Sequence, residues 1–167
     1  MNLFCLRHGL AVEREEFDFA NDHLRPLTPK GKRQLPKIAA AMCAMELRFD
    51  VILSSPLVRA RQTAEIVAAD LKLQKQLVFA DELKPGGDAK KLVQKITGLK
   101  NVPADLLLVG HEPDLSELIS LLVTGKNGAN FALKKAGLAK LEIEKLRAGK
   151  CATLAWLLTP AQMKLMR

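Results

Sequence analysis

The sequence has few aromatic residues: Phe, Trp and Tyr together make up 4% of it, and tyrosine is absent. Proteins that bind single-stranded nucleic acid depend on aromatic stacking, and zinc modules need closely spaced Cys and His ligands. Neither pattern occurs, and the lysines are scattered along the chain. We therefore expect no nucleic acid as partner and no metal site. The 26 Lys and Arg against 18 Asp and Glu still leave a charge of +8, which attracts other anions.

Long apolar runs are also missing. A membrane-spanning helix needs about 20 apolar residues, and no segment approaches that length. Arg7 interrupts the only apolar run near the N-terminus, so we expect no secretory leader. Cys5, Cys43 and Cys151 are odd in number, far apart and set in apolar segments, which predicts buried free thiols. These features together predict a cytoplasmic protein with no membrane partner.

The length and the apolar content favour a folded protein with its own core. The chain has 167 residues, 49% of them hydrophobic, which is enough for one domain of ordinary size. We find no internal repeat, linker or low-complexity segment. The prediction is a single domain over residues 1–167.

Short aliphatic runs alternate with stretches in which apolar residues recur every three or four positions. The first pattern predicts strands and the second predicts helices. The predicted strands cover residues 2–6, 49–53, 77–80, 106–109, 139–143 and 152–158. Helices are predicted to begin near residues 28, 57, 88, 114 and 160. This order predicts an α/β three-layer αβα sandwich, with a mostly parallel central sheet and antiparallel strands from a C-terminal hairpin.

Several residues predict where helices begin or bend. Thr28 is a predicted N-cap followed by Pro29 at the first helical position. Pro36 falls within the same helical pattern and lacks a backbone donor, so we expect a kink or a local defect there. Asp114, followed by Glu117 three residues later, predicts a capping box.

Residues suited to phosphate chemistry follow the predicted strands. Arg7 and His8 end the first strand, where a cation and an imidazole lie side by side. Arg59, Glu82 and His111 each follow a later strand. Ligands of open α/β sheets bind at the carboxyl ends of the strands, so we expect these five side chains to lie close together. The alternative is an ordinary strand end with surface arginines and an incidental histidine.

Three further residues have weaker signals. His23 has no motif around it, and we interpret it as a loop residue. Lys134 and Lys135 precede the last hairpin and could line the mouth of a pocket, but a solvated pair of charges is the simpler interpretation. The segment from Glu13 to Arg25 is polar and lacks periodicity, so it is predicted as a loop.

Taken together, four motifs make the sequence similar to the histidine phosphatase superfamily, also called the phosphoglycerate mutase-like fold. They are LRHG at residues 6–9, LTPKG at 27–31, SSPLVRARQTA at 54–64 and VGHEP at 109–113. The short length, LKPGGD at 83–88 and the continuation GHEPDL resemble the SixA-type phosphohistidine phosphatase branch.

The resemblance implies roles for the five residues. His8 would be the nucleophile, and Arg7, Arg59 and His111 would complete the phosphate pocket, with His111 stabilising the transition state. Glu82 matches a position where many relatives keep a proton donor, although a plain loop carboxylate is the alternative. No cofactor and no metal are expected.

Physical chemistry is consistent with these roles. Neighbouring cations should lower the pKa of His8 below ~6.5, which leaves a nitrogen free to attack. The other ring nitrogen needs a fixed acceptor, such as a backbone carbonyl, to hold the tautomer. The implied function is the dephosphorylation of a protein phosphohistidine through a phosphorylated His8. The alternatives are a phosphatase for small phosphate esters and a module that binds phosphate or a phosphoprotein without chemistry.

Overall fold

The computed structural model describes residues 1–17 and 19–166. The strands of this part are β1 (Asn2–Arg7), β2 (Val51–Ser54), β3 (Leu77–Phe79), β4 (Asp105–Gly110), β5 (Leu138–Ile143) and β6 (Ala152–Leu158). Its α-helices are α1 (Pro29–Ala44), α2 (Val58–Asp70), α3 (Ala89–Thr97), α4 (Asp114–Thr124) and α5 (Pro160–Met163). Three short 3₁₀ helices are η1 (Phe19–Leu24), η2 (Gln74–Gln76) and η3 (Asp81–Leu83).

The six strands form one mixed sheet in the order β3-β2-β4-β1-β5-β6. The first four strands of this order are parallel, whereas β5 and β6 are antiparallel to their neighbours. Arg7 at the end of β1 pairs with Gly110 at the end of β4, and Ser54 at the end of β2 pairs with Val109. The carboxyl ends of three adjacent strands are therefore level with one another. The α/β class and the mostly parallel sheet with an antiparallel hairpin are confirmed.

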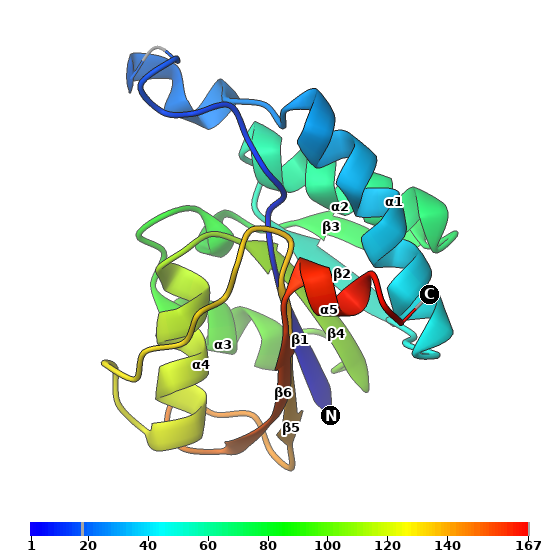
Figure 1. Ribbon diagram of the computed structural model, residues 1–167. Coiled ribbons are helices and arrows are strands. Elements are labelled where there is room, and N and C mark those ends of the chain that lie inside the picture. The colour runs from blue at the N-terminus through cyan, green and yellow to red at the C-terminus, as the bar shows by residue number, and fades with distance from the viewer. Residues whose placement is uncertain (18, 167) are drawn as a thin grey trace.

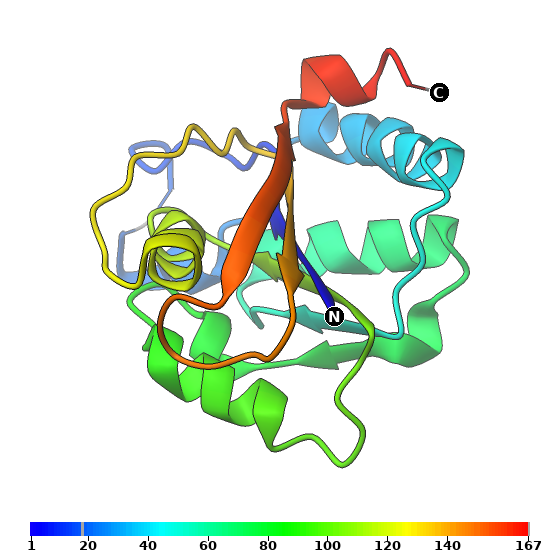
Figure 2. The ribbon, with the colours of Figure 1, turned by 90° about the horizontal axis from the view of Figure 1, so that it is seen from below.

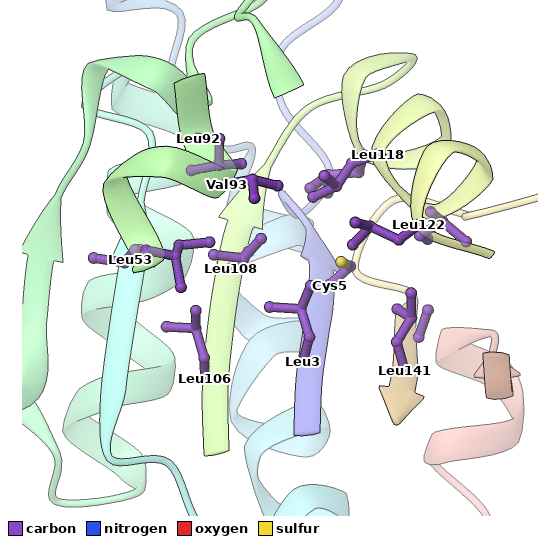
Figure 3. Packing of buried hydrophobic residues seen from close by; sticks show 14 of the residues in the cluster. Leu3, Cys5, Leu53, Leu92, Val93, Leu106, Leu108, Leu118, Leu122 and Leu141 are labelled. Atoms are coloured by element: carbon purple, nitrogen blue, oxygen red, sulfur yellow. The ribbon is translucent and has the colours of Figure 1, made fainter. Parts of the chain in front are cut away.

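Helices cover both faces of the sheet (Figures 1 and 2). Alternate residues of β1 point to opposite faces because successive side chains of a strand do so. Leu3 and Cys5 pack in one cluster with residues of α3 and α4 (Figure 3). Phe4 and Leu6 pack in the other cluster with residues of α1 and α2. The result is the predicted three-layer sandwich, in which α5 lies beside α1.

The loop after β1 is held against the start of α1. The Thr28 backbone N–H donates to the Leu10 carbonyl over 2.9 Å. The Thr28 side chain caps the helix by accepting from the Gly31 N–H over 3.0 Å, and Pro29 opens the helix, as predicted. A Cβ on Gly31 would lie only 2.2 Å from the Leu10 carbonyl oxygen, so no larger residue permits this approach. These contacts fix the chain immediately after His8.

The predicted capping box of α4 is wrong. Pro113 occupies the N-cap position and makes no side-chain cap, so Asp114 is already the first helical residue. Its carboxylate instead accepts from the Gly86 backbone N–H over 2.9 Å. The Gly86 N–H, which takes the place of a helix N–H as donor to this carboxylate, belongs to a loop distant in sequence. A local sequence pattern does not reveal such a contact.

Pro36 does not interrupt α1, which runs from Pro29 to Ala44. Pro36 is on the exposed side of the helix, where water can satisfy the carbonyl that lacks its usual donor. The defect is therefore limited to one missing hydrogen bond.

The prediction of three buried thiols is correct only for Cys5. All three cysteines are free, but Cys43 is exposed and Cys151 is half-buried. Cys43 is exposed because α1 turns that position away from the sheet, although its neighbours are apolar.

Two further observations concern the surface. Within the predicted loop from Glu13 to Arg25, of which position 18 lies outside the described residues, the chain forms η1. Within the described ranges, every helix is too short or too polar to cross a membrane.

Candidate active site

Four of the five predicted site residues line one cavity of about 230 Å³ at the carboxyl ends of the strands. Arg7 ends β1 and His8 follows it, Arg59 is the second residue of α2, and His111 follows β4. They come together because β2, β4 and β1 are neighbours in the sheet. The other lining residues are Arg14, Asp22, Arg25, Pro85, Glu112 and Lys135.

His8 is held in a form suited to nucleophilic attack. Its side chain is 6% exposed, and Nδ1 lies 2.8 Å from the Gly9 carbonyl oxygen. A carbonyl only accepts, so Nδ1 carries the proton and Nε2 keeps its lone pair. Burial is the main cause that lowers the pKa of His8 to about 3; the hydrogen bond to Gly9 opposes the shift, and the charges of His111, Arg59 and Arg7 add to it. The expected backbone acceptor and the expected direction of the pKa shift are both confirmed.

The tautomer of His111 is set by Ser55. Nε2 of His111 lies 2.8 Å from the Ser55 hydroxyl oxygen, which also accepts from the Leu57 backbone N–H over 3.3 Å. Within the described residues the Ser55 hydroxyl proton has no other acceptor, so the arrangement that pairs it has Ser55 donating to Nε2 and the ring proton of His111 on Nδ1. Burial lowers the pKa of His111 to about 3, and Arg59 contributes in the same direction. A neutral imidazole with a donor at Nδ1 results.

Arg7 and Arg59 are both held by backbone carbonyls. Arg7 donates from Nη1 to the Leu133 carbonyl over 3.0 Å. Arg59 donates from Nη1 to the Asp22 carbonyl over 2.9 Å, and its Nη2 is 3.2 Å from the Asp22 carboxylate. Contacts of this kind restrict how the guanidinium groups can turn, which prepares them to bind without reordering.

Three nitrogen donors of these residues are buried and unpartnered within the described part of the chain: Arg7 Nε, Arg59 Nε and His111 Nδ1. An unpaired buried donor is costly, so native proteins rarely keep one without a reason. Here three occur in residues that line one cavity with His8, whose ring centroid is 5.2 Å from that of His111. Donors on residues that line one cavity with a nucleophilic nitrogen are suited to an oxyanion such as a phosphoryl group.

Glu82 is not part of this cavity. It lies in η3 and lines a neighbouring cavity of about 250 Å³, which shares His111 with the first. Lys95 Nζ is 3.1 Å from each of its carboxylate oxygens. A hydrogen bond from its own backbone N–H and the contact with Lys95 lower the pKa of Glu82, although burial opposes them. The proton-donor role remains a prediction.

The structure adds carboxylates that the motifs did not reveal. Asp22 and Glu112 both line the cavity with His8. Burial raises the pKa of Glu112, while hydrogen bonds from Ser116 oppose the shift. Glu112 lies within a recognised motif, but nothing in that motif distinguishes its role. Asp22 lies in a segment without periodicity, so no sequence signal pointed to it.

The remaining candidate residues differ in whether they line the cavity. Lys135 lines the cavity and its Nζ is 3.6 Å from the Glu13 carboxylate, whereas Lys134 is exposed and does not line it. His23 is exposed in η1. Over residues 1–17 and 19–166, no three His, Cys, Asp or Glu side chains are grouped so that they could hold a metal ion.

The two buried histidines predict how stability depends on pH. Each is neutral in the folded protein down to a pH of about 3, whereas an unfolded histidine takes up a proton near pH ~6.5. The unfolded state thus binds more protons below pH ~6.5, so stability falls as the pH is lowered through this window. The slope should reach ~1.4 kcal/mol per pH unit for each histidine.

Urea unfolding at pH 7.0, 5.5 and 4.5 measures this slope. A variant with His8→Gln and His111→Gln is the control, and its free energy of unfolding should change less over the same range. Equal slopes for the variant and the natural protein would contradict the burial of two neutral imidazoles.

Comparison with known proteins places this fold and site in a family. Residues 3–84 match the model of the histidine phosphatase superfamily (branch 1). An uncharacterised protein of Picosynechococcus sp. is 41% identical over 142 residues, which cover 84% of this chain and 84% of that protein. The chain belongs to the histidine phosphatase superfamily, and it is a phosphatase.

Within the superfamily, the chain belongs to the SixA-type branch. It is 28% identical to the phosphohistidine phosphatase SixA of Escherichia coli over 166 residues, 99% of this chain and 98% of that protein. A solved structure of the protein histidine phosphatase SixA with tungstate superposes with a TM-score of 0.81 at 28% identity. The superposition covers 96% of this chain and 98% of that one.

Proposed function

We propose that the chain dephosphorylates a protein phosphohistidine through a covalent phosphohistidine intermediate on His8. The observation that carries the proposal is the set of three unpartnered buried donors in the residues that surround His8, namely Arg7 Nε, Arg59 Nε and His111 Nδ1. The similarity to SixA over nearly the whole chain supports the same substrate class.

The reaction takes place in two transfers. Nε2 of His8 attacks phosphorus, a new N–P bond forms, and the bond to the substrate imidazole breaks. Arg7, Arg59 and His111 stabilise the charge on the transferring oxygens, since positioning and charge stabilisation dominate phosphoryl transfer. Water then attacks the phosphorylated His8, which releases inorganic phosphate and restores the free imidazole.

The position of Glu82 favours a phosphoramidate substrate. An imidazole leaves as a neutral ring if it is already protonated, so it needs little help from a general acid. An alkoxide needs a proton donor, and Glu82 is ion-paired with Lys95 outside the cavity. Arg7 and Arg59 supply the positive charge that a metal would otherwise contribute, and we propose that the reaction needs none.

A phosphatase for small phosphate esters is the second candidate. The observation in its favour is Glu112, which lines the cavity and whose pKa is raised by burial. A carboxyl group that holds its proton to higher pH could protonate a leaving alkoxide.

A panel of substrates tests the proposal. The purified protein should be assayed with a phosphohistidine protein, phosphoramidate and several sugar phosphates under the same conditions. We expect kcat/KM to be highest for the phosphohistidine protein and lowest for the sugar phosphates. A higher kcat/KM for any sugar phosphate than for phosphohistidine would favour the second candidate.

The substitution Glu82→Gln separates the two candidates by leaving group. A general acid contributes ~10²–10⁴-fold, and chiefly when the leaving group is poor. Because imidazole leaves without that help, hydrolysis of phosphohistidine or phosphoramidate should fall by less than about tenfold. Activity on alkyl phosphates should fall much more wherever Glu82 is the group that protonates the leaving alkoxide. Steady-state kinetics on both substrate classes measure the ratio.

Asp81→Asn is the matched control for Glu82→Gln. Asp81 is the preceding residue, is exposed and pairs with Lys84 at the surface. Its loss should leave both substrate classes unaffected. A large and uniform loss in Glu82→Gln alone would make Glu82 essential to both reactions and would favour the ester phosphatase.

A further inference from the structure

Asp22 holds together the cationic side of the cavity. Its carboxylate oxygen Oδ1 is 2.9 Å from Arg25 Nε and 3.6 Å from Arg14 Nε. Its Oδ2 is 3.2 Å from Arg59 Nη2, and its backbone carbonyl accepts from Arg59 Nη1 over 2.9 Å. One residue of η1 thus contacts three guanidinium groups and holds Arg59 at two points.

The two contacts with Arg59 use its two terminal nitrogens. Nη1 and Nη2 face Asp22, whereas Nε is buried and has no partner in the described residues. The guanidinium group is a rigid fork, so fixing its terminal nitrogens also fixes the direction of Nε. The side of the group that includes Nε and the second hydrogen of Nη2 then remains for an incoming oxyanion.

We propose that Asp22 is a positioning residue, which turns Arg59 so that its Nε side faces the transferring phosphoryl group. This inference rests on the proposed role of Arg59 in binding that group. Asp22 itself does not touch the reacting atoms in the proposal. Arg25 in turn holds Asp22, and it is fixed by a 2.7 Å hydrogen bond from its Nη1 to the Val12 carbonyl.

The charges around Asp22 permit a carboxylate near a phosphate site. Burial alone would raise the pKa of Asp22, but Arg59 and Arg25 outweigh it and lower the pKa, so the carboxylate is ionised at neutral pH. Three arginines against one carboxylate leave the assembly positive. The side chain of Arg59 is only 4% exposed, so water competes little for its donors. A fixed cation at this point avoids reorganisation during the reaction.

A competing explanation makes the opposite prediction. If Asp22 were only a counter-ion that phosphate displaces from Arg59, its removal would free the arginine and strengthen anion binding. If Asp22 positions Arg59, its removal would leave the fork free to turn and weaken binding. The sign of the change in anion affinity therefore distinguishes the two.

Asp22→Asn is the test variant because the amide keeps the size and loses the charge. We expect the Kd values for inorganic phosphate and for orthovanadate, both measured by direct binding, to rise, and kcat for phosphoramidate to fall, by roughly 10- to 100-fold. Asp22→Glu, which restores the carboxylate, should recover part of the loss. In an Arg59→Lys background, Asp22→Asn should have a much smaller effect because lysine has no fork to orient.

Glu65→Gln is the matched control. Glu65 pairs with Arg61 at 3.4 Å on the same helix as Arg59, but both side chains are about half exposed. Its loss should not change anion binding or kcat. Thermal unfolding of every variant shows whether the fold is retained.

Each result decides the question. Tighter binding of phosphate and orthovanadate in Asp22→Asn, with kcat unchanged, would overturn the positioning role and leave a simple counter-ion. Unchanged binding and unchanged kcat would overturn it as well. The anion measurements need no turnover, so a natural protein that binds orthovanadate but does not hydrolyse phosphohistidine would overturn only the proposed substrate.

Discussion

Replacing His8 by Ala is expected to abolish both turnover and the formation of a phosphorylated enzyme. Nε2 of His8 is the nitrogen that keeps a lone pair, because Nδ1 donates to the Gly9 carbonyl. Alanine offers no atom that can form the N–P bond, so kcat should fall by roughly 10⁴-fold or more, as for other catalytic nucleophiles. The small remainder would come from binding by the arginines.

Trapping of the intermediate measures this directly. The natural protein, quenched during turnover of labelled substrate, should carry phosphate that is labile in acid and stable in alkali. His8→Ala should carry none, and His23→Ala, which changes an exposed histidine outside the cavity, should label normally. Equal labelling of His8→Ala and the natural protein would place the nucleophile elsewhere.

Removal of Arg7 or Arg59 is expected to cost roughly 10²-fold or more in turnover. Arg7→Ala and Arg59→Ala each take away a guanidinium group whose buried Nε has no other partner in the described chain. The charge on the equatorial oxygens then loses one of its fixed counter-charges in a site of low dielectric. KM should rise as well, because the ground-state phosphoryl group is also anionic.

Steady-state kinetics with phosphoramidate measure these losses, and Arg61→Ala is the control. Arg61 is on the same helix as Arg59 but is half exposed and paired with Glu65, so its removal should have little effect. Activity should also persist in EDTA. Loss of activity in EDTA that added metal restores would contradict the assignment of this role to the arginines.

The ends of the strands were predictable because each contains local information. A short aliphatic run followed by a polar residue identifies a strand end, and the residues after β1, β2 and β4 were chosen on that basis. Parallel strands bring such ends to one edge of the sheet. Arg7, His8, Arg59 and His111 accordingly meet in one cavity, as expected from the sequence.

The same reasoning from strand ends failed for Glu82. It also follows a strand, but β3 is at the outer edge of the sheet, two strands away from β4. Strand order depends on how whole strands pair, and local sequence patterns do not predict it. The side chain meets Lys95 of α3 and lines the neighbouring cavity instead.

The sequence by itself determined the class of fold, the position of His8 as the proposed nucleophile and the set of proposed phosphate-binding residues. These depend on periodicity and on residues within a few positions of each other. Only the tertiary structure decided which carboxylates accompany them. Asp22 lies 37 positions before Arg59 in a segment without periodicity, and their contact exists only because the segment after β1 folds against the start of α2. A contact between residues so far apart depends on the packing of the whole chain, and neither of the two local sequences predicts it.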